Sequence, residues 1–340
     1  MLTSIHIQGF KNFKDTQITP LRKVNLILGG QNVGKTSLLE AVYLGASPVG
    51  NVSNLPAVFR LAEGSDRQRF LEMTFKEVKG LIELCLDRRI ECQTVHERHR
   101  GISNMQPAVL VTAINPAEKT PSDPILFAGV EFGGIRFSQQ IRPSSASTPP
   151  NELFNFPLAI SVNLPNQVEA VRLLDQVVLK RKKRILLDAL RRIEPRLEDI
   201  HSLSPDGEQR VYLELDGLAT AVPLPQLGHG FSRLLYLYCS LLVTDAKLAL
   251  VDEVENGIHY ASLPILFKGV QDMAATQGVQ TLMTTHSWDC IRAAYKTFAD
   301  AGCLQDFQLI RLEREGDNVR AVIINDDMLD TVMEAGYEVR

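Results

Sequence analysis

The segment from Gly29 to Thr36 constrains the fold of this chain more than any other feature. It reads Gly-Gly-Gln-Asn-Val-Gly-Lys-Thr and fits the pattern G-x-x-x-x-G-K-[ST], a glycine-rich turn that wraps phosphate groups. An apolar run over 24–28 precedes it and predicts a buried strand, while residues 37–43 follow it with a helical pattern. In this context, backbone N–H groups and the positive end of a helix can bind phosphate. The sequence therefore predicts a nucleotide site in an α/β fold.

The individual positions of this turn have predicted tasks in nucleotide binding. Lys35 is expected to reach the β- and γ-phosphates, and the hydroxyl of Thr36 is expected to bind Mg²⁺. The glycines let backbone N–H groups turn inward around the phosphate oxygens. The residues expected to contact the nucleotide are Gly29, Gln31, Asn32, Val33, Gly34, Lys35, Thr36 and Ser37.

A second apolar run, over 248–251, ends in the two acids Asp252 and Glu253. Strands of a parallel sheet deliver such residues to the carboxyl edge, where ligands bind in open α/β folds. We expect Asp252 to support Mg²⁺ beside Thr36, and Glu253 to act as the general base that polarises the attacking water. A strand that simply ends in solvated acids is the alternative, and the glycine turn earlier in the chain argues against it.

Two further motifs complete the predicted site. The run 281–284 predicts a strand that leads to His286, which we expect to bond to the γ-phosphate or the attacking water. The alternative is an ordinary surface histidine. A second glycine turn, with Gly228 and Gly230, precedes a helical pattern over 234–243. One nucleotide uses only one such turn, so we expect the second to complete the site of another copy in a homodimer or higher oligomer.

The remaining patterns predict one domain over 1–340. The predicted subdivision is a β-rich and loop-rich insertion at about 46–157, a helical insertion at about 163–205, and a half over about 206–310 that holds the second glycine turn and both catalytic candidates. Strand-like runs occur at 70–78, 81–87, 108–114, 130–141 and 158–162. Other predicted elements are an antiparallel ribbon from Ile5 to Ile18, one long helix from about Gln167 to Arg192, and a hairpin that turns at Asp216-Gly217.

Composition places the chain among ordinary globular proteins. Hydrophobic residues make up 45% and charged residues 22% of its 340 residues. No run of about 18 apolar residues predicts a membrane span, and the N-terminus lacks the pattern of a signal peptide. The five cysteines are odd in number and widely spaced, which is typical of reduced thiols in a cytoplasmic protein. The formal net charge of −4 argues against a surface coated for non-specific nucleic-acid binding.

With these motifs in this order, the chain resembles the ABC-type ATPases of the RecF, SMC and OLD group. The opening Ile5–Phe13 resembles the first strand and Asn-Phe element of that group. Leu227–Phe231 occupies the place of its Leu-Ser-Gly-Gly-Gln signature, and His286 matches its switch histidine. The run Asp252–His259 covers Walker B and the D-loop, and it resembles small stand-alone bacterial ATPases with an Asp-Glu-x-Glu-Asn-Gly-x-His run.

The resemblance implies an ABC-type head: an α/β fold with an antiparallel N-terminal β-subdomain and a helical insertion. It implies that ATP and Mg²⁺ are the cofactors and that ATP is hydrolysed in sites shared across a dimer. The dimer is expected to control DNA or a partner effector in phage defence or DNA repair. No long heptad arm is present, and no room is left for the TOPRIM nuclease domain of OLD proteins. A separately encoded TOPRIM-type nuclease is therefore an expected partner.

Three positions depart from the family pattern. Gly228 stands where the signature serine would contact the γ-phosphate in the partner copy, His229 replaces a glycine, and His259 stands where the D-loop usually has aspartate. Hydrolysis is therefore expected to be slow. Asn163 is a candidate for the Q-loop residue, with a plain loop asparagine as the alternative. The rival functions are a nucleotide-gated scaffold with little turnover and a GTPase-like switch, although no Asn-Lys-x-Asp guanine motif is present.

One basic cluster is a candidate contact for DNA or an acidic partner protein. Five consecutive cations form it, and a solvated helix face is the alternative interpretation. Its members are Lys180, Arg181, Lys182, Lys183 and Arg184.

Overall fold

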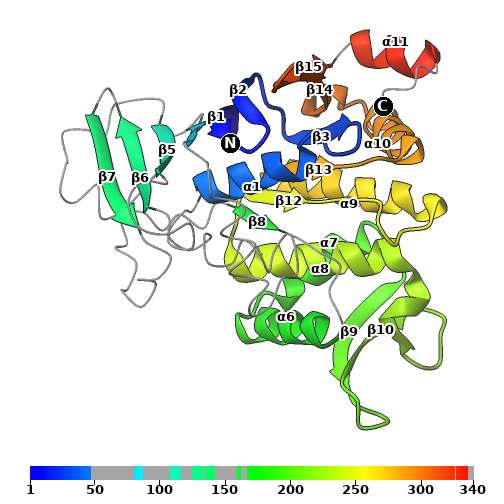
Figure 1. The fold of residues 1–340 in the computed structure, drawn as a ribbon. Helices are drawn as coiled ribbons and strands as arrows, with labels where there is room; N and C mark the ends of the chain where they lie inside the picture. Colours follow the sequence, from blue (N-terminus) through cyan, green and yellow to red (C-terminus); the bar gives the residue numbers. More distant parts are fainter. Residues whose placement is uncertain are drawn as a thin grey trace.

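The computed structural model describes residues 1–46, 80–86, 108–115, 125–132, 135–141, 159–161, 167–325 and 327–335. These residues form two six-stranded sheets and one three-stranded sheet. Helices pack between and around the sheets (Figure 1).

The central sheet is mostly parallel and carries the predicted motifs. Its strands are β3 (Val24–Gly29), β8 (Ala159–Ser161), β12 (Leu248–Val251), β13 (Gln280–Thr284), β14 (Phe307–Glu315) and β15 (Asn318–Ile324). They lie in the order β15-β14-β3-β13-β12-β8, and β15 is antiparallel to β14. Because β3, β12 and β13 run in parallel, their carboxyl ends meet at one edge of the sheet. This topology brings the ends of three motif strands together.

The central sheet separates two hydrophobic cores, because successive strand residues face opposite sides. On β3, Val24, Leu26 and Leu28 face one core, and Ile27 faces the other. The first core is shared with α8 (His229–Thr244), α9 (Leu263–Thr276) and α10 (Trp288–Asp300), and the second with α1 (Lys35–Ala46). Because both faces are covered, the strand is apolar almost throughout.

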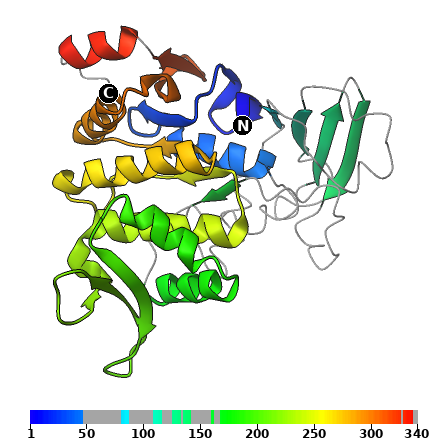
Figure 2. The ribbon, with the colours of Figure 1, turned by 180° about the vertical axis from the view of Figure 1, so that it is seen from behind.

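The second six-stranded sheet is antiparallel and lies on the far side of α1. Its strands are β1 (Leu2–Phe10), β2 (Phe13–Ile18), β4 (Gly80–Leu86), β5 (Ala108–Asn115), β6 (Ile125–Phe132) and β7 (Ile135–Ile141). Their order is β2-β1-β4-β5-β6-β7, and β5 to β7 extend beside the central body in both views (Figures 1 and 2). The predicted N-terminal ribbon and β-subdomain are confirmed, since Ile5, Ile7, Phe10, Phe13 and Ile18 are all buried.

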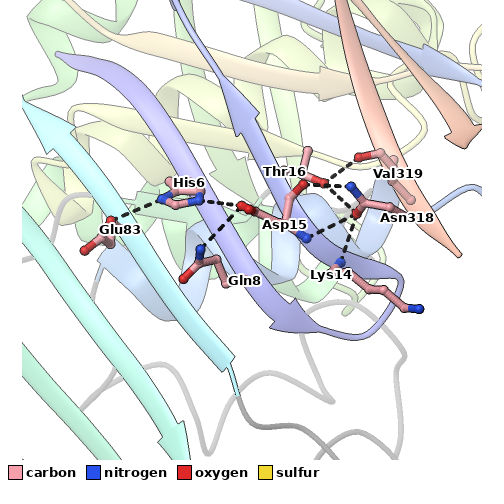
Figure 3. A network of polar contacts seen from close by, with 8 residues as sticks. All are labelled: His6, Gln8, Lys14, Asp15, Thr16, Glu83, Asn318 and Val319. Atoms are coloured by element: carbon pink, nitrogen blue, oxygen red, sulfur yellow. Dashed lines mark hydrogen bonds and ion pairs between the residues drawn. The ribbon is translucent and has the colours of Figure 1, made fainter.

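Polar contacts join the two six-stranded sheets (Figure 3). Asn318, at the start of β15, accepts hydrogen bonds from the backbone N–H groups of Lys14 and Asp15 at 3.0 and 3.2 Å. Its amide donates to the carbonyl oxygen of Asp15 at 2.7 Å. On the same side, His6 lies between Asp15 and Glu83, at 2.7 and 3.2 Å, and so links β1 to both of its neighbours.

A third part of the molecule lies beyond the β8 edge of the central sheet, at the bottom of Figure 1. It contains α6 (Gln167–Leu179), α7 (Lys183–Arg191), β9 (Leu197–Leu203), β10 (Arg210–Leu215) and β11 (Val222–Pro223). β10 pairs antiparallel with β11, as expected for a hairpin around Asp216-Gly217. The helices end at Arg191, so the last part of the expected helical insertion is strand β9.

The predicted long helix from Gln167 to Arg192 is wrong, because the chain turns after α6. Arg181 has a φ of 57° in the left-handed region. The N–H of Lys182 bonds to the carbonyl of Val177, and the N–H of Arg181 bonds to that of Val178, at 2.9 Å each. This pattern is a Schellman motif, which usually has glycine at the left-handed position. With arginine there, the sequence carried no signal for the break.

The other expected elements fall partly on described residues. The runs at 81–87, 108–114 and 158–162 correspond to β4, β5 and β8, and the run at 130–141 covers the end of β6 and all of β7. The run at 70–78 lies outside the described residues. The remaining short elements are 3-10 helices at Leu224–Leu227, Tyr260–Ser262 and Leu304–Asp306, and the helix α11 (Asp327–Ala335). In the described part of the chain, no helix has both the length and the apolar character to span a bilayer.

Candidate nucleotide-binding site

The glycine turn between β3 and α1 is shaped by close neighbours on both sides. Gly29 has a φ of 141°, and a Cβ atom there would lie 2.6 Å from the carbonyl oxygen of Leu312 in β14. Gly34 has a φ of 117°, and a Cβ atom there would lie 3.2 Å from the ring of Phe13. Only glycine fits both positions without moving a strand or the aromatic ring. The turn is therefore held between β14 and the β1–β2 turn.

Lys35 is buried and points back into this turn. Its Nζ donates hydrogen bonds to the carbonyl oxygens of Gly29 at 2.7 Å and Gly30 at 2.8 Å. Burial lowers the pKa of the Lys35 ammonium, and the acids Asp252, Glu255 and Glu253 oppose this by raising it. A phosphate bound in the turn would offer the Lys35 ammonium a full negative charge as its partner, in place of the two neutral carbonyl oxygens.

Asp252 lies directly against the first turn of α1, although β13 separates its strand from β3. The hydroxyl of Thr36 donates to its carboxylate, at 2.9 Å from Oδ2 and 3.2 Å from Oδ1. Thr284, at the end of β13, donates from its hydroxyl to Oδ1 at 2.6 Å. The two predicted metal ligands thus lie side by side, and a residue of the intervening strand orients the carboxylate.

The donor set of Thr36 and Asp252 fits Mg²⁺. Both side chains offer oxygen, which this hard cation prefers. Among the described residues, no group of three or more His, Cys, Asp or Glu side chains is placed to hold a metal. A hydroxyl and one carboxylate suit an ion that takes its other ligands from water and the phosphates of a bound nucleotide.

Most of the predicted residues of the glycine turn line an open cleft of about 440 Å³ above it. Glu253 and His286 reach it from the ends of β12 and β13. An adjoining pocket of about 450 Å³ shares Gln31, Glu253 and His286 with it. The residues that line the first cleft are Asn12, Gln31, Asn32, Gly34, Lys35, Thr36, Ser37, Glu253 and His286.

The backbone of Glu253 is held in an unusual conformation. Its φ is 47°, in the left-handed region that costs a non-glycine residue about 1–3 kcal/mol. Its N–H donates to the hydroxyl of Thr284 at 2.8 Å, and its carbonyl accepts from the N–H of Asn256 at 2.8 Å and from the guanidinium of Arg233 at 3.3 Å. These bonds compensate the strain, while the Glu253 side chain stays exposed at the cleft.

His286 is positioned by the acid two residues beyond Glu253. The backbone N–H of His286 donates to Oε1 of Glu255 at 2.7 Å. This bond joins the loop after β12 to the loop after β13, so the two predicted catalytic side chains belong to one hydrogen-bonded unit.

Some predicted residues do not lie in the cleft. The side chain of Val33 is buried in the core with α1, so this residue can offer only its backbone to a nucleotide. Gly228 and Gly230 are not among the described residues that line the cleft. They lie beside Ser262, and a Cβ atom at Gly230 would be 3.0 Å from its backbone oxygen. Asn163 lies outside the described residues.

The basic cluster is also remote from the cleft and is largely engaged with its own chain. Lys180 donates to the carbonyl of Val243 at 2.6 Å. Lys182 pairs with Asp245 at 2.5 Å, and Lys183 with Asp199 at 2.7 Å. The cluster forms the turn between α6 and α7 and the start of α7, and its exposed members are Lys180, Arg181 and Arg184.

Four residues at the site carried no assigned role in the sequence analysis: Asn12, Arg233, Glu255 and Thr284. Asn12 donates to the carbonyl of Asn32 at 3.2 Å and lines the cleft. A cation inside an otherwise apolar helical run is a sequence signal that could have found Arg233. A polar residue at the end of a buried strand could likewise have indicated Thr284.

Comparison with known proteins agrees with this arrangement. A family described as "AAA domain, putative AbiEii toxin, Type IV TA system" matches residues 132–289, and an "AAA domain" family matches residues 4–98. An "ATP/GTP phosphatase" of Helicobacter pylori is 24% identical over 94% of both chains. A "DNA replication and repair protein RecF" of Shewanella baltica is 28% identical over 34% of this chain and 32% of its own length.

Solved structures extend the likeness to the whole fold. An SMC head bound to the C-terminal winged-helix domain of ScpA covers 95% of this chain and 98% of its own, with a TM-score of 0.56 and 12% identity. The SMC head domain of Thermotoga maritima gives a TM-score of 0.52 over 96% of this chain and 99% of its own, again with 12% identity. The predicted ATPase-head fold is confirmed.

Proposed function

We propose that this chain, which is an ABC-type P-loop ATPase of the RecF/SMC group, binds Mg-ATP in sites shared by two copies and uses its hydrolysis to control a partner. One observation carries the proposal. The glycine turn with Thr36, the adjacent acids Asp252 and Glu253, and His286 come from three chain segments and meet at one cleft.

Each residue of the cleft has a chemical task in this proposal. Thr36 and Asp252 would hold the Mg²⁺, which supplies charge stabilisation to the phosphates when bound. Lys35 binds the β- and γ-phosphates, and Glu253 accepts a proton from the attacking water. His286 donates a hydrogen bond to the γ-phosphate or positions that water. The residues that cradle the phosphates are Gly29, Gln31, Asn32, Val33, Gly34 and Ser37.

The second glycine turn supports a site shared between copies. Gly228 and Gly230 lie at the start of α8, where backbone N–H groups point out of the helix. They do not line the described cleft of their own chain, so a phosphate for them must come from another copy. Gly228 offers no hydroxyl to that phosphate, which is why we propose slow turnover.

We propose that the ATP-dependent dimer controls a separately encoded effector, such as a TOPRIM-type nuclease, or DNA, in phage defence or DNA repair. The support comes from relatives. One matched family is described as a putative AbiEii toxin of a type IV toxin–antitoxin system, and the RecF relatives are named for DNA replication and repair. A cytoplasmic location belongs to the same proposal, because the described cysteines are free thiols.

DNA contact through the basic cluster is the weaker form of this proposal. Lys182 and Lys183 pair with acids of their own chain, so Lys180, Arg181 and Arg184 carry most of the outward charge. If DNA binds there, affinity should fall steeply with salt and with Arg184→Glu. If Arg184→Glu leaves the DNA affinity and its salt dependence unchanged, the basic cluster does not contact DNA.

The test of the proposed function separates binding from chemistry. Lys35→Ala removes a phosphate contact and should weaken ATP binding by about 100-fold or more, as a lost charge-assisted bond of roughly 3 kcal/mol predicts. Glu253→Gln should bind ATP within about twofold of the wild type and hydrolyse it at least about 100-fold more slowly. Nucleotide titration and phosphate release measure the two effects. Equal loss of binding in both variants would contradict these roles.

A nucleotide-gated scaffold with little turnover is the second candidate. The glycine at position 228 favours it, because the signature serine has no counterpart there. If the wild type hydrolyses ATP no faster than Glu253→Gln does, the scaffold is supported and the hydrolytic function is refuted.

A further inference from the structure

Arg233 is a buried cation that no predicted task explains. It lies in α8, four residues after His229, with only 2% of its surface exposed. Its guanidinium donates to three backbone carbonyls, those of Asp252 and Asn256 at 3.1 Å each and that of Glu253 at 3.3 Å. All three belong to the loop that follows β12. Burying an arginine is costly, so a triple contact of this kind indicates a specific purpose.

The Arg233 contacts define the geometry of the predicted catalytic base. The peptide N–H of Glu253 donates to Thr284 of β13, and its carbonyl accepts from the N–H of Asn256 in the same loop and from Arg233 of α8. Because Glu253 is in the left-handed region, it keeps its direction only while both ends of the residue are held. Thr284 holds one end from β13, and Arg233 is the contact that ties the other end, together with the loop carbonyls of Asp252 and Asn256, to α8.

Arg233 also lies on the same rigid element as the second glycine turn. A rise of 1.5 Å per residue places it about 6 Å along α8 from His229. Near the start of the helix, Gly230 packs against Ser262, which follows the β12 loop. Leu234, the next residue after Arg233, packs closely against Gly269 of α9. A Cβ atom at Gly269 would lie only 2.2 Å from the side chain of Leu234. The start of α8, the β12 loop and α9 therefore form one packed block.

We propose that Arg233 is a positioning residue that ties the catalytic carboxylate Glu253 to α8, and so links engagement of the second glycine turn to hydrolysis. When Gly228–Gly230 contact a nucleotide bound by another copy, that contact acts directly on the start of α8. The guanidinium then carries any shift of the helix to the Glu253 carbonyl. This inference rests on the proposed function for the role of Glu253 as general base and for the shared site.

The test replaces the forked guanidinium with a single ammonium. Arg233→Lys keeps the charge but cannot reach three carbonyls with the same geometry. We expect kcat to fall about tenfold or more, while the dissociation constant for ATP stays within about twofold. Self-association in Mg-ATP should persist, because the glycine turn is unchanged.

Arg22→Lys is the matched control, since Arg22 donates to the carbonyls of Leu304 and Phe307, both at 3.0 Å. These contacts lie at the opposite end of β3, and this variant should keep the wild-type kcat.

A cycle with Glu253→Gln separates positioning from a general loss of structure. If Arg233 acts through Glu253, Arg233→Lys should slow the residual hydrolysis of Glu253→Gln by less than about twofold, because groups that act as a unit are non-additive. Additive losses would overturn the inference, as would a parallel rise in the ATP dissociation constant or an equal effect of Arg22→Lys. Arg233→Met, which retains no donor, should show the same non-additivity with a larger single effect. Wild-type turnover by Glu253→Gln would instead refute the proposed function.

Discussion

A few polar atoms with several partners determine the geometry of the site. Thr284 is fully buried, and its hydroxyl donates to Asp252 at 2.6 Å while it accepts from the N–H of Glu253 at 2.8 Å. One oxygen atom therefore orients both the predicted metal ligand and the predicted base. No other side chain of β13 contacts both acids among the described residues.

Thr284→Val is expected to weaken Mg²⁺ binding more than nucleotide binding. The substitution keeps the shape but removes a hydrogen bond to a carboxylate, worth about 1.5–3 kcal/mol. The Mg²⁺ concentration for half-maximal hydrolysis should rise about tenfold or more, and ATP binding measured without Mg²⁺ should change little. Hydrolysis followed across a Mg²⁺ titration measures the shift.

Thr281→Val is the matched control on the same strand. The buried hydroxyl of Thr281 has no hydrogen-bond partner among the described residues. Its removal should leave Mg²⁺ dependence unchanged and be neutral or slightly stabilising. An equal Mg²⁺ effect in both valine variants would show that Thr284 acts through strand packing and not through its two bonds.

The sequence predicts the residues whose role follows from spacing and chemistry, and misses those whose role follows from a distant partner. The turn from Gly29 to Thr36 and the acids at 252 and 253 stand in recognisable local patterns, and parallel strands bring them to one edge. Arg233 and Thr284 stand out as polar residues in apolar runs, but no local pattern shows what they bind. Their partners lie 19 and 32 residues away along the chain, so only the packed structure shows their roles.

At the scale of elements, the N-terminal strands show how a partly exposed cluster joins neighbouring strands. His6 of β1 lies between Asp15 of β2 and Glu83 of β4 (Figure 3). The hydrogen bond to Asp15 raises the pKa of His6 above its ordinary value near 6.5, burial opposes this, and Glu83 adds to the increase. The same bond lowers the pKa of Asp15. The charged pair is therefore favoured in the folded sheet.

The free energy of unfolding should depend on pH because of this charged pair. A histidine whose pKa is raised by folding stabilises fully below its unfolded value near 6.5, and this stabilisation is lost as pH rises through the folded pKa. His6→Gln should therefore be less stable than the wild type at about pH 5.5 and nearly equal to it at about pH 8.5. The difference should be at most about 1 kcal/mol, because both side chains are partly exposed.

Thermal or urea unfolding of both proteins across this pH range measures the difference. Asp15→Asn should reproduce the pattern of His6→Gln, since either change removes the charged pair. A stability difference that stays constant with pH would mean that the histidine contributes by packing alone.

At the scale of the whole molecule, the two glycine turns serve different surfaces. The first lines the cleft at the edge of the central sheet, together with the ends of β12 and β13. The second begins α8 beside Ser262, and His229 is exposed at its tip. This separation is the structural basis for expecting two copies to complete each other's sites.

His229→Asp should therefore oppose ATP-dependent self-association without disturbing the fold. The residue is the first of α8, where a carboxylate is favourable to the helix dipole, so the helix should be retained. The same carboxylate would face the γ-phosphate of the other copy, and like charges brought together should weaken association about tenfold or more. Light scattering of the Glu253→Gln protein with and without Mg-ATP measures association. His229→Asn, neutral and similar in shape, should associate as the parent does. If the aspartate and asparagine variants associate equally well in Mg-ATP, no nucleotide phosphate meets this turn, and the shared site is refuted.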